Sequence, residues 1–278
     1  MATIYGKNIL STWKMALLAG SYDSLFKYPK RTTVKYTNYA EVDGINPLLS
    51  KFETEPRRVS LNFMIRHNSQ SEFWGLYNNF CNEMMSDGYR TMNLENGLTY
   101  ELRYDKMQRA RAIRMFDYSD GATSFTIDFI EDTTAIKPSV VNPVGGVRLK
   151  GMFVVDGRDF GDFGIHPDGD IGEVLRLADV KDRFFDGREY CVADSKLKHR
   201  ELTLNFWMLS ASKSEFVHNY QAFYNAFAKT GKQSLYSKEA DGTTDVYYMD
   251  CTSYKVLWSD SPAAKFGIKF CVPVVNWS

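Results

Sequence analysis

The chain repeats part of itself at a spacing of 143 residues, and this repeat restricts its architecture more than any other feature. Arg57–Gly88 aligns with Arg200–Gly231 without a gap, and 12 of the 32 positions are identical. Average composition gives roughly two identities over such a length. The repeat predicts two copies of one structural unit. The identical pairs are Arg57/Arg200, Leu61/Leu204, Asn62/Asn205, Phe63/Phe206, Ser69/Ser212, Ser71/Ser214, Glu72/Glu215, Phe73/Phe216, Tyr77/Tyr220, Phe80/Phe223, Asn82/Asn225 and Gly88/Gly231.

The first part of each copy has the pattern of a half-buried strand. Apolar and polar residues alternate with a period of two, which places one set on a buried face. The phase is the same in both copies, so the same face is buried in each. The apolar positions are Val59, Leu61, Phe63 and Ile65, and then Leu202, Leu204, Phe206 and Met208.

The second part of each copy has the pattern of an amphipathic helix. Ser69 and Ser212 each stand three residues before a glutamate, which is the signature of a capping box. Aromatic residues then recur at helical spacing, which is typical of a core-facing stripe. Gly88 and Gly231 follow where a left-handed C-terminal cap is expected.

Further short strands are predicted after each helix. They are Thr99–Tyr104, Arg111–Tyr118 and Ser124–Ile130 in the first half, and Asp245–Asp250, Ser253–Trp258 and Lys265–Val272 in the second. The fold class is therefore mainly β (α+β), with one flanking helix in each module.

The two modules have a predicted boundary rich in proline and glycine. Pro138, Pro143, Gly145 and Gly146 fall within Thr133–Lys150, as in a linker. We assign 1–138 to the first module, 139–150 to the linker and 151–278 to the second. The segments Ser11–Pro56 and Gly161–Lys198 align poorly, which is typical of loops adapted to different neighbours.

Charge and composition exclude several classes of protein. Lys+Arg and Asp+Glu are both 34, so the formal net charge is zero, which disfavours a strongly basic nucleic-acid binder. Aromatic residues make up 15%, which favours β-rich structure and large buried interfaces. No segment approaches 18 consecutive apolar residues, so we expect no membrane span. The four cysteines, Cys81, Cys191, Cys251 and Cys271, lack metal or redox spacing and are expected to be free thiols.

No catalytic, cofactor-binding or metal-ligating residue can be assigned. The four histidines, His67, His166, His199 and His218, form no metal-binding motif. No nucleophile elbow or phosphate-binding loop is present. The glycine-rich run Gly157–Gly164 fits strand and turn geometry better than a phosphate cradle. We expect no enzyme activity and no cofactor.

Two other local patterns leave alternatives open. Asp168-Gly169-Asp170 and Asp241–Asp245 offer possible calcium ligands, but Asp-Gly is first a turn signal. Residues 103–116 sum to +4 and residues 117–132 to −5. A basic hairpin can meet phosphate, but a solvated face or a salt-bridged contact with an identical neighbour explains the pattern better.

The second half opens with Gly151–Ile165, which contains Gly157-Arg158-Asp159-Phe160. This opening resembles distal tail proteins of long-tailed bacteriophages, and the later strand, capped helix and strands look like the tail-tube and distal-tail module. The resemblance implies two tandem tail-tube-like β-sandwich modules, each with one flanking helix. It implies a structural virion protein, located at the tail tip or baseplate and assembled in the host cytoplasm. It carries no catalytic residues.

The repeat adds an expectation about assembly. The resemblance implies a ring of modules around the DNA channel, and many members of the family form hexamers. A chain with two modules supplies two of six such positions, so we favour a homotrimeric pseudo-hexameric ring over a homohexamer. The expected partners are the tail tube protein, baseplate hub proteins and genomic DNA that crosses the lumen without specific binding. If the repeated strands are the inner ones, Ser60, Asn62, Thr203 and Asn205 face that lumen.

Two alternatives remain within the same tail apparatus: the tail tube protein itself, or a carbohydrate-binding β-sandwich of the host-adhesion device.

Overall fold

The computed structural model describes residues 2–94, 97–108, 111–114, 121–136, 142–145, 152–169, 172–181, 183–185, 188–190 and 196–274. They form two compact units. Unit 1 comprises Met1–Lys27, Pro56–Lys137 and Lys255–Ser259, and unit 2 comprises Tyr28–Glu55, Pro138–Tyr254 and Asp260–Ser278. In the described part of the chain, no helix is long and apolar enough to cross a membrane.

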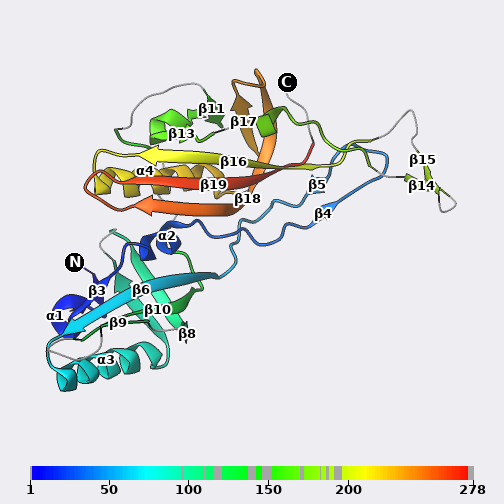
Figure 1. Ribbon diagram of the computed structural model, residues 1–278. Helices are drawn as coiled ribbons and strands as arrows, with labels where there is room; N and C mark the ends of the chain where they lie inside the picture. Colours follow the sequence, from blue (N-terminus) through cyan, green and yellow to red (C-terminus); the bar gives the residue numbers. More distant parts are fainter. Residues whose placement is uncertain are drawn as a thin grey trace. The chain divides into compact units, whose positions relative to one another are not determined.

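Unit 1 contains an antiparallel sheet in the order β2-β1-β7-β8-β10-β6-β3, with β9 paired to β10 (Figure 1). Its helix α3 lies along β6. The elements are β1 (Thr3–Ile4), β2 (Lys7–Asn8), α1 (Ile9–Trp13), β3 (Met15–Leu17), α2 (Ser21–Phe26), β6 (Arg57–His67), α3 (Gln70–Met85), β7 (Tyr89–Asn93), β8 (Thr99–Met107), β9 (Arg111–Arg114) and β10 (Gly121–Glu131).

Unit 2 contains a sheet in the order β12-β11-β17-β18-β19-β16-β13. Element for element, this is the order found in unit 1, apart from β9. The elements are β11 (Phe153–Val155), β12 (Arg158–Asp159), the 3₁₀ turn η1 (Phe160–Phe163), β13 (Ile165–Pro167), η2 (Gly172–Leu175), β16 (Arg200–Leu209), α4 (Lys213–Phe227), β17 (Gln233–Ser237), β18 (Gly242–Leu257) and β19 (Ala263–Val272). Two small ribbons, β4 (Tyr36–Thr37) with β5 (Asn46–Pro47) and β14 (Arg183–Phe185) with β15 (Arg188–Tyr190), complete it.

These elements confirm the predicted mainly β (α+β) class. The repeated strands are β6 and β16, and the repeated helices are α3 and α4. One prediction about strands is wrong: Asp245–Asp250 and Ser253–Trp258 are not two strands but belong mostly to the single strand β18. In the first half, Arg111–Tyr118 is described only as far as Arg114.

The alternating pattern of β6 produces the core of unit 1. Val59, Leu61, Phe63 and Ile65 are all fully buried, and Phe63 packs edge-on against Phe80 of α3 at 5.0 Å between ring centroids. The same holds in unit 2, where Phe206 meets Phe223 of α4. Burial of such aromatic side chains supplies much of the stabilising free energy of each unit.

One of the two hydrogen bonds of the predicted capping box is present in both helices. The Oγ atoms of Ser69 and Ser212 accept hydrogen bonds from the amides of Glu72 (3.4 Å) and Glu215 (3.2 Å). The reciprocal bond is replaced in α3, because the Ser69 amide donates to Nδ1 of His67.

The two glycines predicted at the helix C-termini do have left-handed backbones, with φ of +89° at Gly88 and +76° at Gly231. They lie beyond the cap residues Ser86 and Ala228, in the turns that lead to β7 and β17.

Short hairpin turns open both units. Tyr5 and Gly6 have φ of +50° and +73°, and Asp156 and Gly157 have φ of +46° and +80°. Two successive residues with positive φ define the turn that suits a tight hairpin. The glycine-rich run thus begins as turn and strand, as predicted, and continues as the 3₁₀ helix η1, which was not predicted.

The two units do not divide the chain at a single point. The 1–138 module was predicted to include residues 28–55, but this segment, here called the arm, lies with unit 2. Tyr28 stacks on Tyr220 at 4.2 Å between ring centroids, and its hydroxyl donates to the carbonyl of the same residue. Most of the predicted linker 139–150 lies outside the described residues, apart from 142–145.

Candidate functional site

The histidines occupy four separate environments. His67 faces Glu72 at 3.1 Å, and His218 Nε2 lies 2.7 Å from the carbonyl oxygen of Asn142. His166 is buried, and burial lowers its pKa. His199 lines a cavity of unit 2. Among the residues that the structure describes, no three His, Cys, Asp or Glu side chains gather as metal ligands.

The Asp-Gly sequences lie at turns. Asp241 has φ of +44° and stands directly before β18, in the turn from β17. Gly169 likewise has a left-handed backbone, and Asp170 falls outside the described residues. The turn interpretation therefore accounts for the described residues of both sequences.

The basic and acidic patches meet within unit 1. Arg103 of the basic patch lies with its Nε 2.6 Å from the carboxylate of Asp132 of the acidic patch. Asp105, the acidic residue of the basic patch, pairs instead with Arg58, outside both patches, at 3.1 Å. The hydrogen bond from Arg103 lowers the pKa of Asp132. Part of the charge on each patch is therefore neutralised inside the unit.

The polar residues that alternate with the core of β6 carry a hydrogen-bonded layer. Ser60 Oγ donates to Asp128 at 2.7 Å, and Asn62 Oδ1 accepts from Thr126 at 2.6 Å. Ser24 of α2 also donates to the Ser60 carbonyl. Ser60 and Asn62 are half-buried here, as is Thr203 in unit 2, whereas Asn205 is exposed.

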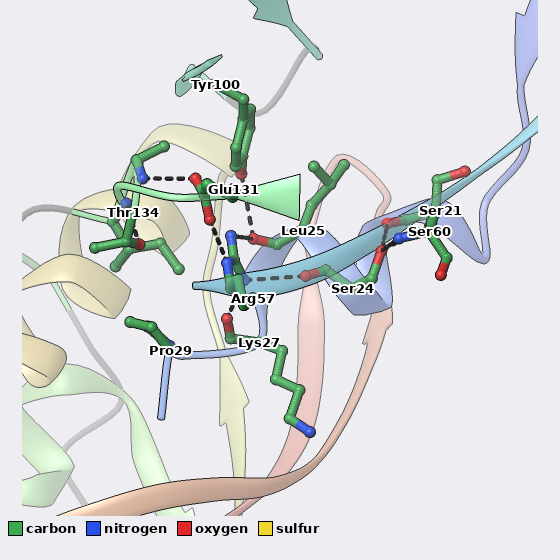
Figure 2. Close-up of polar contacts among 12 residues, drawn as sticks. Ser21, Ser24, Leu25, Lys27, Pro29, Arg57, Ser60, Tyr100, Glu131 and Thr134 are labelled. Carbon is green, nitrogen blue, oxygen red and sulfur yellow. Dashed lines mark hydrogen bonds and ion pairs between the residues drawn. The ribbon is translucent and has the colours of Figure 1, made fainter. Parts of the chain in front are cut away.

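Arg57 anchors the end of α2 in unit 1. Figure 2 shows its guanidinium between Glu131 and the carbonyls of Ser24, Leu25 and Lys27, which accept its hydrogen bonds. Glu131 is buried and accepts from the Ala135 amide as well. This network satisfies carbonyls that the short helix leaves open.

Unit 2 contains a cavity of about 270 Å³ that the sequence analysis did not anticipate. The arm provides one wall, with Lys30, Arg31 and Tyr36. The strands β16, β18 and β19 and the residue before β16 provide the rest, including His199, Glu201, Tyr247, Asp250, Lys269 and Cys271.

The cavity has little capacity for nucleophilic chemistry. Burial raises the pKa of Cys271 to about 11 and also raises the pKa of Tyr247. A thiol with such a pKa is protonated near neutral pH, so it is a poor nucleophile. Lys269 is paired with Glu201 at 2.5 Å. The polar groups here suit binding better than catalysis.

Sequence reasoning missed this cavity because the arm and the strands are far apart in the chain. Arg31 meets β18 through its amide, which donates to the Met249 carbonyl. The only advance signal is that Lys27-Tyr28-Pro29-Lys30-Arg31 concentrates charge and aromatic character in a segment without a repeat partner.

Comparison with known proteins finds similar chains among solved structures. No protein-family model and no curated protein sequence matches the chain. Among solved structures, the chain is similar to Dit (gp 19.1) of phage SPP1, described as a paradigm of the hub adsorption apparatus in phages that infect Gram-positive bacteria. The identity is 10%, the TM-score is 0.32, and 98% of each chain is covered.

Proposed function

We propose that this chain is a structural protein of a bacteriophage tail, present in the virion as a ring at the tail tip or baseplate. In this proposal the ring joins the tail tube to the hub and lets DNA pass. The observation that carries it is the pairing of a sequence repeat with two sheets of the same strand order. Two copies of one module in a chain suit an assembly that repeats that module around an axis.

Sheet edges offer a way to join the modules. In the described part of the chain, β3 pairs only with β6, and β13 pairs only with β16. An edge strand of this kind presents backbone donors and acceptors to a neighbouring chain, and ring closure covers it. Since each chain has both edges, three chains supply six equivalent positions.

The charge distribution suits a lumen through which DNA slides. The chain has a formal net charge of zero, and Arg103 and Arg58 are paired with carboxylates. Firm phosphate binding requires clustered and uncompensated Lys and Arg. The proposed ring therefore surrounds DNA without gripping it, and it contacts the tube protein on one face and hub proteins on the other.

Native mass spectrometry of the purified protein tests the proposal. We expect a trimer of about 96 kDa, three times the 31.9 kDa chain. We also expect no retardation of duplex DNA in gels at 0.15 M salt, where exposed charges are screened beyond roughly 8 Å. A stable monomer, or tight DNA binding that falls steeply with salt, would contradict the proposal.

A further inference from the structure

The arginines of the two units differ in how their hydrogen-bond donors are used. Arg90 in unit 1 is fully buried and donates to several carbonyls at the end of α3, including those of Glu83 (2.8 Å), Met84 (3.1 Å) and Gly88 (2.8 Å). Arg57 donates to Glu131 and three carbonyls. Both guanidinium groups are well satisfied, as burial of a charge requires.

Arg31 in unit 2 uses fewer of its donors. It is only 3% exposed, and its single side-chain hydrogen bond runs from Nη2 to the Lys51 carbonyl at 3.0 Å. Its Nη1 atom is buried and has no hydrogen-bond partner among the described residues. A buried donor without a partner costs about 1–3 kcal/mol, and more when it is charged.

The arginine also lines the cavity described above, in a fixed orientation. The Phe52 and Tyr247 rings lie 5.0 Å and 5.6 Å from its guanidinium carbon, within the range of cation–π contact. These contacts and the Lys51 carbonyl hold the guanidinium in the cavity wall. Its Nη1 atom has almost no accessible surface, so a bound carboxylate reaches it only after the side chains that line the cavity shift.

The other cations of the cavity are already neutralised. Lys269 pairs with Glu201 at 2.5 Å, and Lys30 pairs with Glu55 at 3.0 Å. Burial lowers the pKa of Arg31. Arg31 is therefore the cation of the cavity that lacks a carboxylate partner in the described part of the chain.

We propose that this cavity binds a small organic monocarboxylate, with Arg31 as the residue that holds its carboxylate group. A guanidinium matches a planar carboxylate through paired N–H donors. Asp250 also lines the cavity, and its carboxylate repels a dianion such as phosphate more strongly than a monoanion. The rings of Tyr36 and Tyr247, with Val34, provide an apolar wall for the body of the acid. This proposal stands apart from ring formation.

Thermal shift and calorimetric titration with sodium benzoate test the proposal, with benzamide as the uncharged analogue of the same shape. At 20 mM and constant ionic strength, we expect benzoate to raise Tm by about 2–4 °C. Benzamide and phosphate should leave Tm unchanged. Equal shifts with benzoate and benzamide, or a larger shift with phosphate, would overturn the proposal without any variant.

Two variants test whether Arg31 provides the positive charge that binds benzoate. Arg31→Met should weaken benzoate binding at least tenfold, whereas Lys35→Met, which removes an exposed charge from the same arm outside the cavity, should not. Without ligand, Arg31→Met should keep or raise Tm, because it removes a buried donor that has no partner. Unchanged benzoate affinity in Arg31→Met would overturn the assignment.

A second titration distinguishes two possible origins of the bound carboxylate: an acidic side chain of a partner protein and a small free acid. N-acetylglutamate amide presents a carboxylate as a protein side chain does, whereas benzoate presents it as a free acid. Tighter binding of the first would assign the cavity to a partner's acidic side chain, and tighter binding of benzoate to a free acid. Binding of neither would refute the site.

Discussion

Arg57 in unit 1 and Arg200 in unit 2 occupy the same position of the repeat but are supported differently. Each begins the repeated strand of its unit, β6 or β16. Each donates to carbonyls at the end of a short helical segment, α2 for Arg57 and η2 for Arg200. The shared task is to satisfy carbonyls that a helix end leaves open.

The difference lies on the neighbouring strand. Arg57 is opposite Glu131 on β10, and the two form an ion pair. Arg200 is opposite Val272 on β19, and its Nε and Nη2 atoms have no partner in the described part of the chain. Burial accordingly lowers the pKa of Arg200. Both arginines donate to carbonyls, but only Arg57 has a carboxylate partner. We therefore infer that an arginine at this position of the repeat needs the carbonyl contacts and does not need the carboxylate.

The largest expected effect comes from making unit 1 resemble unit 2. Glu131→Val should lower the free energy of unfolding by about 3–5 kcal/mol, because it leaves a buried guanidinium without its counter-charge. Urea denaturation at fixed protein concentration measures the change, and hydrogen exchange on β6 and β10 locates it.

The matched control is Arg200→Met in unit 2. It should change stability by no more than about 1 kcal/mol, since the lost carbonyl contacts are offset by removal of two unpartnered nitrogens. If Arg200→Met destabilises as much as Glu131→Val, the contrast between the two arginines is wrong.

A second comparison concerns the residue that ends the first helical turn of each unit. Gly164 has φ of +73°, and a Cβ there would lie 2.6 Å from the Leu209 carbonyl oxygen. We expect Gly164→Ala to cost at least about 2 kcal/mol.

The corresponding residue in unit 1 is Lys14, with φ of +54°. Lys14→Gly should raise stability by about 0.5 kcal/mol, because glycine adopts this backbone without strain, although its freer unfolded chain offsets part of the gain. Thermal unfolding of the two variants in parallel tests both. Destabilisation of similar size in both would mean that the Lys14 side chain stabilises unit 1 by more than its left-handed backbone costs.

Modest and equal effects are expected where the two units agree. Ser69→Ala and Ser212→Ala each remove a hydroxyl that accepts the amide of the residue three positions later. Each should cost about 1 kcal/mol. Amide exchange at Glu72 and Glu215 should accelerate in the respective variant only, and protected amides in either variant would rule out that cap.

Local pattern predicted much of this fold. The alternation of β6 and β16, the serine caps of α3 and α4, and the strands β10 and β19 are set by residues close in sequence. The extent of β18 was not predicted, because polar residues near Asp250 and Ser253 look like a turn.

The arm and the cavity could not be predicted from local patterns in the sequence. Tyr28 and Tyr220 meet across 192 positions of the chain, and Arg31 reaches its neighbours Tyr247 and Met249 in the same long-range way. Neither the stacking of these rings nor the missing partner of Arg31 has a periodic signature in the sequence.

Single-particle electron microscopy of the assembled protein tests the central proposal most directly. If each chain supplies two copies of one module to a ring, end-on views will show six lobes around a central hole, with strict symmetry only three-fold. Six identical lobes with strict six-fold symmetry, or particles without a central hole, would contradict it.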